Sequence, residues 1–256
     1  MSLPGQTVQV ISEQFLASVR PAYEQLEQAL AGMAELSADP VGSLRVGFTA
    51  TTDGPVLNRL TEAFQARHPG CRASMHEVPV CDPFAALRKD EVDVVANWLV
   101  SLDADLTMGP AIAYYDRVLA VSRRHRLAGR TSVSFEDLGE ESVADPPPSF
   151  PASLADALFP LRTPSGRPIR RAQVPRSPYE IMAHVARGEI VQLTMTGLAF
   201  LQRDDVILVP VRDLPPMPLG LIAARYRANA GVSAFAEVAR SLPPFRATLS
   251  QSQPAT

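Results

Sequence analysis

The residues best suited to chemistry in this sequence are hydroxyl side chains that follow an alternating apolar segment. Thr49, Ala50, Thr51 and Thr52 come directly after that segment, and a helical pattern begins just beyond them. Threonine hydroxyls donate and accept hydrogen bonds, and the free amides of a helix start suit a carboxylate or another anion. The same threonines could instead only cap the helix. Asp53 would compete for those amides, which favours a neutral or weakly polar ligand.

The usual signs of catalysis are absent from the sequence. The four histidines are scattered, at His68, His76, His125 and His184. None has a recognised spacing to a serine or cysteine nucleophile. Cys71 and Cys81 have no second pair to complete a zinc site, and no phosphate-binding loop is present. We therefore expect no enzyme, no metal site and no cofactor, and we interpret the basic run 123–126 as a solvated loop, with a phosphate or DNA role as the alternative.

Length and charge limit the class of protein. The 256 residues are 46% hydrophobic, enough for one large core or two smaller ones. A net charge of −3 differs from the basic face of a domain that grips DNA by itself. The sequence shows no signal peptide and no apolar run of about 20 residues, the length that a membrane span needs. Two isolated cysteines fit a reducing compartment, so we expect a cytoplasmic protein.

Apolar periodicity predicts the elements that position these residues. Val10–Leu36 has a helical stripe, which could pair with another chain or pack on its own domain. A strand, helix, strand, helix and strand are then predicted over Ser43–Phe48, Gly54–His68, Cys71–Val78, Asp82–Lys89 and Val92–Trp98. This order indicates a parallel sheet with right-handed crossovers.

A second α/β unit is predicted to follow the first. Its strands are expected at Ala113–Ser122, Ile169–Val174, Ile190–Leu193, Val206–Val209 and Leu219–Ala224. Its helical segments are expected at Phe135–Leu138, Ser153–Phe159, Pro178–Arg187 and Val232–Leu242. The last strand and the last helix could return to the first unit. Many of the 24 prolines cluster, and these clusters mark loops.

Several segments, taken in order, resemble the regulatory half of the LysR-type bacterial transcription regulators. They are Gly42–Phe48, Leu60–Pro69, Leu87–Val95, Arg117–Val121 with His125–Ala128, and Val133–Leu138. The resemblance runs from about residue 10 to residue 242. It implies two Rossmann-like lobes joined by crossover strands, the type 2 periplasmic-binding-protein-like fold, preceded by a long linker helix.

The resemblance also implies a division of the chain. Residues 1–40 would be the linker helix, residues 41–118 and 219–256 the first lobe, and residues 119–218 the second lobe. The family's winged helix-turn-helix has no counterpart here, so we expect a piece of a longer regulator that binds DNA only through that missing unit. Family members pair, so a homodimer or tetramer is expected.

In the family, a small effector lies in the cleft between the lobes. The positions that the resemblance and the strand ends assign to this cleft are Thr49, Ala50, Thr51, Thr52, Val80, Trp98, Ser101, Pro146, Ser149, Thr194 and Thr196. Trp98 ends a predicted parallel strand, where ligand loops gather, and it could stack an aromatic effector or simply pack in the core. We expect a polar or aromatic metabolite whose binding shifts the lobes.

Two rival functions remain open. A solute-binding protein of a transporter shares the two-lobed plan, but the missing signal peptide and the amphipathic segment Val10–Leu36 argue against it. An enzyme of related fold is the third reading, and it would require a substrate that is turned over.

Overall fold

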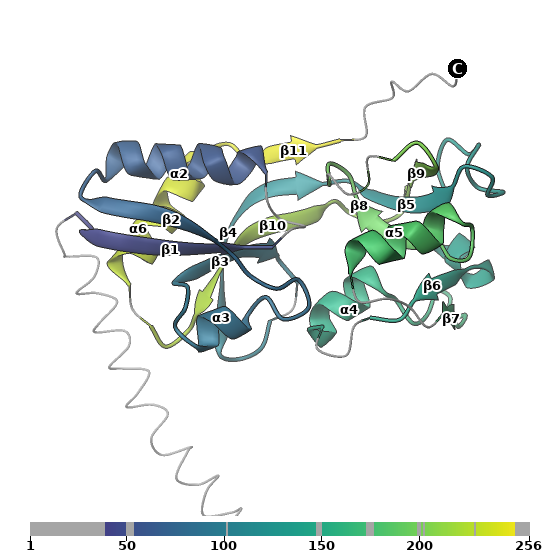
Figure 1. Cartoon of the computed structure of the whole chain (residues 1–256), viewed down its shortest axis with the longest axis horizontal. Coiled ribbons are helices and arrows are strands. Elements are labelled where there is room, and N and C mark those ends of the chain that lie inside the picture. The colour runs from purple at the N-terminus through teal and green to yellow at the C-terminus, as the bar shows by residue number, and fades with distance from the viewer. Residues whose placement is uncertain are drawn as a thin grey trace, which may run out of the picture.

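The computed structural model describes residues 39–49, 54–100, 102–146, 150–172, 177–198, 201, 203–227 and 229–248. The helix predicted over Val10–Leu36 lies outside these residues. The described chain forms two groups of strands and helices that lie side by side along the long axis of the molecule (Figure 1). This arrangement confirms the predicted two-part α/β fold.

The first group is built on a six-stranded sheet with the order β11-β4-β10-β3-β1-β2. Its strands are β1 (Gly42–Phe48), β2 (Cys71–Glu77), β3 (Val94–Trp98), β4 (Leu106–Tyr115), β10 (Met217–Ala224) and β11 (Phe245–Ala247). β1 pairs in parallel with both β2 and β3, as the sequence predicts. β10 runs antiparallel between β3 and β4, so the complete sheet is mixed.

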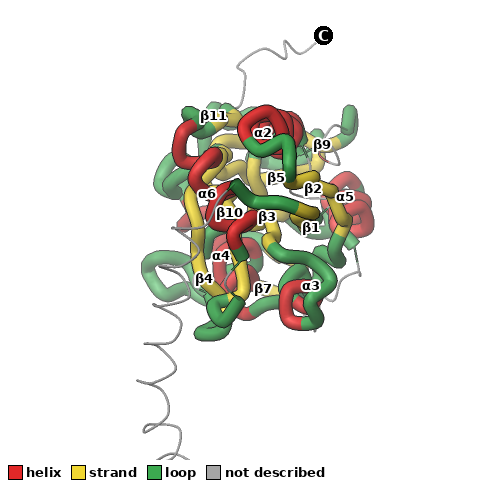
Figure 2. The backbone as a smooth tube through the Cα atoms, turned by 90° about the vertical axis from the view of Figure 1, so that its left-hand side faces the viewer, coloured by secondary structure: helices red, strands yellow, loops and turns green. Residues whose placement is uncertain are grey.

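Helices cover both faces of this sheet. α2 (Pro55–Arg67) and α6 (Ala230–Ser241) lie together on one side, and the short α3 (Ala85–Arg88) lies on the other (Figure 2). The rings of Phe64 and Phe235 join α2 to α6 edge to face, 5.2 Å apart. The N-cap residue of α2 is Gly54, without a side-chain hydrogen bond, so Thr49 does not cap this helix.

The second group has a three-stranded antiparallel sheet with the order β8-β5-β9 and a parallel pair, β6 and β7. The strands are β5 (Arg117–Ser122), β6 (Ser142–Ala144), β7 (Arg170–Ala172), β8 (Gln192–Met195) and β9 (Val206–Pro210). The helices are α4 (Ala152–Leu158) and α5 (Pro178–Ala186), with a 3-10 turn at Phe135–Glu140. A parallel bridge between Val143 and Val191 brings β6 against the start of β8.

The predicted strand Ala113–Ser122 is two strands in different sheets. β4 ends at Tyr115 and β5 begins at Arg117, with Asp116 between them. The Asp116 amide donates to the carbonyl of Ala247 in β11, and its carbonyl accepts from the amide of Thr196, just after β8, so its two backbone groups bond to different sheets. The charged residues Asp116 and Arg117 interrupt the apolar pattern at this point and were the available sign of the break. The chain returns to the large sheet between β9 and β10.

Most of the buried apolar residues form one core that reaches across both groups. It contains Trp98 and Leu219 from the large sheet together with Met182, Met195 and Leu198 from the smaller group. A second, smaller core around Leu119 and Leu138 belongs to the smaller group alone. Among the described residues, none of the helices is both long and apolar enough to cross a bilayer.

Candidate ligand-binding site

A cavity of about 70 Å³ lies where the two groups of strands meet. It is lined by Thr49, Val80, Asn97, Trp98, Phe150, Leu154, Leu158, Phe159, Pro178, Ile181, Met182, Gln192, Leu193, Thr194, Met195 and Leu198. Thr49 and Trp98 stand at the carboxyl ends of the parallel strands β1 and β3, the edge of a sheet where ligands bind in α/β folds. β8, α4 and the first turn of α5 supply the opposite walls.

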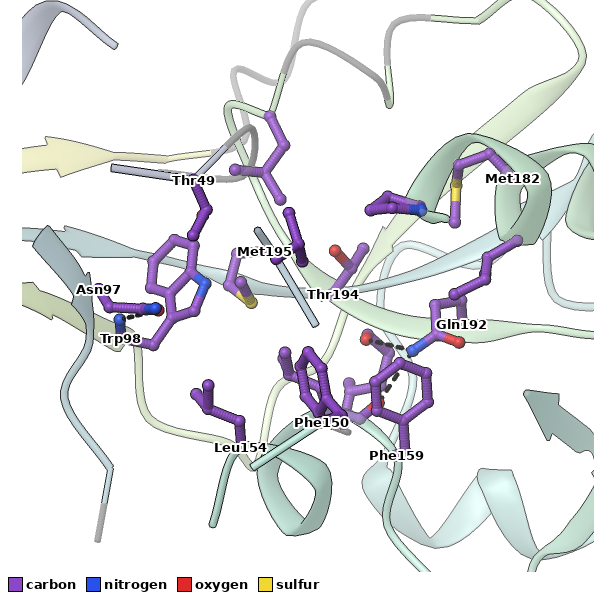
Figure 3. A pocket seen from close by; sticks show the side chains of 16 residues that line it. Thr49, Asn97, Trp98, Phe150, Leu154, Phe159, Met182, Gln192, Thr194 and Met195 are labelled. Carbon is purple, nitrogen blue, oxygen red and sulfur yellow. Dashed lines mark hydrogen bonds between the residues drawn. The ribbon is translucent and has the colours of Figure 1, made fainter. Parts of the chain in front are cut away.

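Trp98 is both a core residue and a cavity residue. Its side chain is 2% exposed and contacts the ring of Tyr115 edge to face, with centroids 5.3 Å apart. Its backbone amide donates to Oδ1 of the neighbouring Asn97 over 2.7 Å, which fixes Asn97 against the strand end. Figure 3 shows the indole on one side of the cavity and Phe159 on the other. Trp98 therefore packs in the core and also lines the cavity, and its contact with a ligand stays a prediction.

An aromatic and aliphatic wall faces Trp98 from α4. We call Leu154, Leu158 and Phe159 the α4 wall; Leu154 and Phe159 are buried, and Leu158 is partly buried. Phe150, just before the helix, packs edge to face on Phe159 at 5.5 Å. The sequence predicts the helix but not this role. The available signal for this role was the apolar face of the predicted helix. The helix follows the proline-rich loop that was expected to face the cleft.

Gln192 is the polar residue of the cavity that the sequence reasoning missed. Its side chain is 5% exposed, and Nε2 donates to the carbonyls of Leu158 at 2.9 Å and Leu193 at 3.0 Å. Its Oε1 is buried and has no hydrogen-bond partner among the described residues. An amide flip would set Oε1 against two carbonyl oxygens, so the assignment is fixed by the neighbours. A glutamine inside the apolar run Ile190–Met195 was the available signal.

Four of the predicted site residues lie together around this cavity. They are Thr49, Val80, Trp98 and Thr194. Thr196 is not among the lining residues, because its hydroxyl donates to the carbonyl of Ala247 at 2.7 Å and is enclosed there. Pro146 is also absent from the lining and is partly buried in the loop after β6. Ala50, Thr51, Thr52, Ser101 and Ser149 lie outside the described residues.

The described lining carries no ionisable side chain. Twelve of its sixteen residues are apolar, and the other four are neutral amides or hydroxyls. Within the described part of the chain, no group of three or more histidine, cysteine, aspartate or glutamate residues could hold a metal ion. The cavity is therefore suited to an apolar body with neutral polar groups.

The basic run 123–126 is occupied by contacts outside this cavity. The Arg123 guanidinium donates to the carbonyl of Asp204, and Arg126 pairs with Glu141 at 2.6 Å. His125 also lies 3.2 Å from the Glu141 carboxylate. These contacts tie the loop after β5 to its surroundings in the smaller group, and they support a structural role for three of the four residues.

The chain is similar to proteins of known kind along most of its length. Residues 37–243 match the family of LysR substrate binding domains. A curated relative is the HTH-type transcriptional regulator ShiR of Corynebacterium glutamicum (strain R), which is 23% identical over 174 residues and 68% of this chain. The matched part spans 59% of the length of that relative.

Solved structures share the fold at low sequence identity. The effector binding domain of QuiR in complex with shikimate has a TM-score of 0.62 at 15% identity, covering 78% of this chain and 95% of its own. The BenM effector binding domain with benzoate has a TM-score of 0.59 at 19% identity, covering 78% and 90%. Full-length CbnR with its target DNA has a TM-score of 0.58 at 18% identity, covering 90% and 81%.

Proposed function

We propose, because this chain belongs to the family of LysR substrate binding domains, that it is the effector-sensing part of a transcription regulator. The observation that carries the proposal is the cavity between the two groups of strands, which joins the carboxyl ends of β1 and β3 to α4 and β8. Parallel sheets place ligands at this edge. A molecule held here touches both groups and can alter how they sit together.

The lining supports a small ligand with an apolar ring or chain and few neutral polar groups. Trp98 and Phe159 offer apolar faces, and Thr194 offers a hydroxyl. Gln192 Oε1 lacks a hydrogen-bond partner within the described part of the chain and would accept from a hydroxyl or N–H group. The family neighbours QuiR and BenM were solved with shikimate and benzoate. For this chain the uncharged lining favours a hydroxylated over a carboxylated ligand.

The size of the cavity implies that binding moves its walls. A cavity of about 150 Å³ holds a benzene ring in an engineered protein. The 70 Å³ found here is smaller, so a ring-sized ligand must separate the walls to enter. A ligand that binds the widened form better shifts the population toward it, which is the basis of a sensor.

The remaining parts of the proposal concern the whole protein. DNA would be bound through a winged helix-turn-helix in the rest of the regulator, and the regulator would act as a homodimer or tetramer in the cytoplasm. We propose the lobe boundaries 41–118 with 219–256, and 119–218, which lie close to the points where the chain changes sheets, at Asp116 and before Met217. The chain would sense its ligand without transforming it. A solute-binding role is less favoured, since the family match is to regulators.

Thermal shift with three ring compounds tests this function. Phenol, toluene and benzoate share one ring and differ in the polar group. We expect phenol to raise the midpoint of unfolding most, since ligand at about 100 times its Kd adds about 2.7 kcal/mol of stability. Binding should also change the fluorescence of Trp98, the single tryptophan.

A matched pair of variants locates the binding. Thr194→Val removes a cavity hydroxyl and should weaken phenol binding, whereas Thr107→Val alters an exposed strand residue remote from this lining and should not. If neither these compounds nor a wider set of small metabolites protects the fold, the sensing function is rejected. If benzoate protects best, sensing stands and the preference for a neutral ligand is rejected.

A further inference from the structure

The α4 wall is held by three side chains from three different strands. The last carbonyls of a helix have no partner within it and need other donors. The donors here are Arg117 of β5 to Ala157, Gln192 of β8 to Leu158, and Arg171 of β7 to Phe159. Positive groups are also favourable at the negative end of the helix dipole. The position of the wall therefore depends on side chains rather than on its own short helix.

Arg117 differs from the other two donors in what else it touches. It is the first residue of β5, directly after the point where the chain leaves the large sheet. One of its terminal nitrogens is 2.5 Å from the Ala157 carbonyl, and the other is 3.8 Å from the sulfur of Met217. Met217 is the first residue of β10, where the chain returns to the large sheet. Arg117 thus stands at one connection between the sheets, and its guanidinium contacts the other connection and the helix of the cavity wall.

Holding a charge at this place is costly. Arg117 is 8% exposed, and among the described residues no carboxylate pairs with it and its Nε has no hydrogen-bond partner. Burial lowers the pKa of the guanidinium to about 10. Replacing a buried charge by an apolar side chain of similar size is often neutral or stabilising. Global stability therefore does not explain why an arginine stands here. Its place at one connection, together with its contacts to α4 and to the other connection, explains it better.

We propose that Arg117 is a positioning residue that links the α4 wall to the two connections between the sheets, so that a displacement of the wall is passed to those connections. This inference deepens the proposed function and rests on it for its purpose. Its neighbour in the β5–β8 pairing, Met195, lines the cavity, which places the start of β5 directly behind the cavity lining.

Arg171 provides a matched control within the same chain. It also donates to an α4-end carbonyl, that of Phe159, and its second terminal nitrogen donates to Ala144 at 2.8 Å. Both acceptors belong to the smaller group, and among the described residues Arg171 bonds to Ala144, Phe159 and Asp145 rather than to Met217 or the start of β5. Arg171→Met should therefore loosen α4 without affecting the connections.

Hydrogen–deuterium exchange of the full chain, without ligand, tests the link. In Arg117→Met we expect amides of α4 and of residues 113–118 and 209–218 to exchange about five- to tenfold faster, the effect of losing one hydrogen bond. Amides of β1 and β3 report global opening and serve to normalise the rates. Arg171→Met should change α4 and β6–β7 only.

The outcomes separate a link from simple capping. If Arg117→Met accelerates exchange in α4 but leaves residues 113–118 and 209–218 unchanged, the link is rejected. Unchanged exchange everywhere also rejects it. Should Arg117→Met fail to fold, Arg117→Lys keeps the charge but offers a single ammonium in place of the fork. In Arg117→Lys, amides of residues 113–118 and 209–218 should exchange more slowly than in Arg117→Met and faster than in Arg171→Met.

The test is independent of the ligand. Coupled exchange together with a failure of every metabolite to bind would keep the link and reject the sensing function. Binding of phenol, without faster exchange at the connections in Arg117→Met, would keep the sensing function and reject the link.

Discussion

At the scale of single residues, the site combines groups that the sequence indicates with one that it hides. Thr49 follows a predicted strand and Trp98 ends one, and the family resemblance together with the rule that ligands gather at carboxyl strand ends selected them. Thr196 was expected in the same cleft segment but lies outside the cavity lining, because β8 ends at Met195 and the Thr196 hydroxyl bonds to Ala247 of β11. Gln192 was missed because one of its two partners, the Leu158 carbonyl, belongs to a helix distant in sequence.

Asp93 is a residue whose charge stabilises the fold away from the site. Its side chain is 10% exposed. It accepts from the Arg45 amide at 2.7 Å and from the Arg45 guanidinium at 2.7 Å and 3.2 Å. Burial by itself would raise the pKa of Asp93, but these hydrogen bonds and the positive charge of Arg45 keep it below its usual value. The ionised form is therefore favoured in the folded state.

We expect Asp93→Asn to lower the free energy of unfolding at pH 7 by about 1–3 kcal/mol, as for a buried hydrogen bond to a charged group. Because the folded pKa is lowered, this contribution is complete above the unfolded pKa of about 4 and is lost as the pH falls below it. Urea unfolding at pH 7 and pH 3 should show the difference between variant and parent shrinking in acid.

An exposed ion pair gives the control for this pH dependence. Asp205 pairs with Arg203 at the surface, so Asp205→Asn should change stability much less at pH 7. A constant difference between Asp93→Asn and the parent from pH 7 to pH 3 would contradict the role assigned to the Asp93 charge.

At the scale of elements, local pattern explains which segments are helices and strands, and distant pairing explains their arrangement. β1, α2, β2 and β3 follow from periodicity, and the parallel pairs β1–β2 and β1–β3 join segments that lie close in sequence. β11 and β6 have three residues each, too few to show a period, and they exist because β4 and β7 supply their hydrogen bonds. The place of β10 between β3 and β4 is likewise set by partners more than 100 residues away.

Gly220 shows how closely β10 is fitted between its neighbours. A Cβ added at Gly220 would lie 2.6 Å from the carbonyl oxygen of Pro110 and 2.5 Å from a methyl group of Leu99. The carbonyl belongs to the backbone of β4 and cannot turn aside. We expect Gly220→Ala to lower the free energy of unfolding by about 1–3 kcal/mol, measured by urea denaturation.

The matching control is Gly129→Ala. A Cβ at Gly129 would meet no atom within 4 Å, and this exposed turn position should tolerate alanine with little change in stability. Equal effects at the two glycines would show that the close contact at Gly220 is not what limits the residue there.

At the scale of the whole molecule, the family resemblance and the alternating strands and helices were enough to predict the fold class. The division into lobes remains a prediction, and the described core does not follow that division. Residues from both sheets pack into one cluster, with Trp98 and Leu219 in contact with the same body of side chains as Met182 and Met195. Sequence cannot reveal this, because the apolar pattern of a strand is the same whichever core it enters.

A shared core predicts a single unfolding transition. In urea, the fluorescence of Trp98 and the far-UV circular dichroism should change with the same midpoint, which is the behaviour of one cooperative unit. The second core around Leu119 is small and depends on β5, which also enters the shared core through Ala120. Two separated midpoints would show that the two groups of strands are stable independently.

The central place of β10 has a consequence for the order in which the protein is made. About 100 residues separate the end of β4 from the start of β10, and a ribosome adding 5–20 residues per second needs roughly 5–20 s to synthesise them. Until then β3 and β4 each present an unpaired edge, the kind of surface that recruits other chains. The nascent protein therefore passes through a period in which shielding by a chaperone would protect it, and slower translation between these two strands would lengthen that exposure.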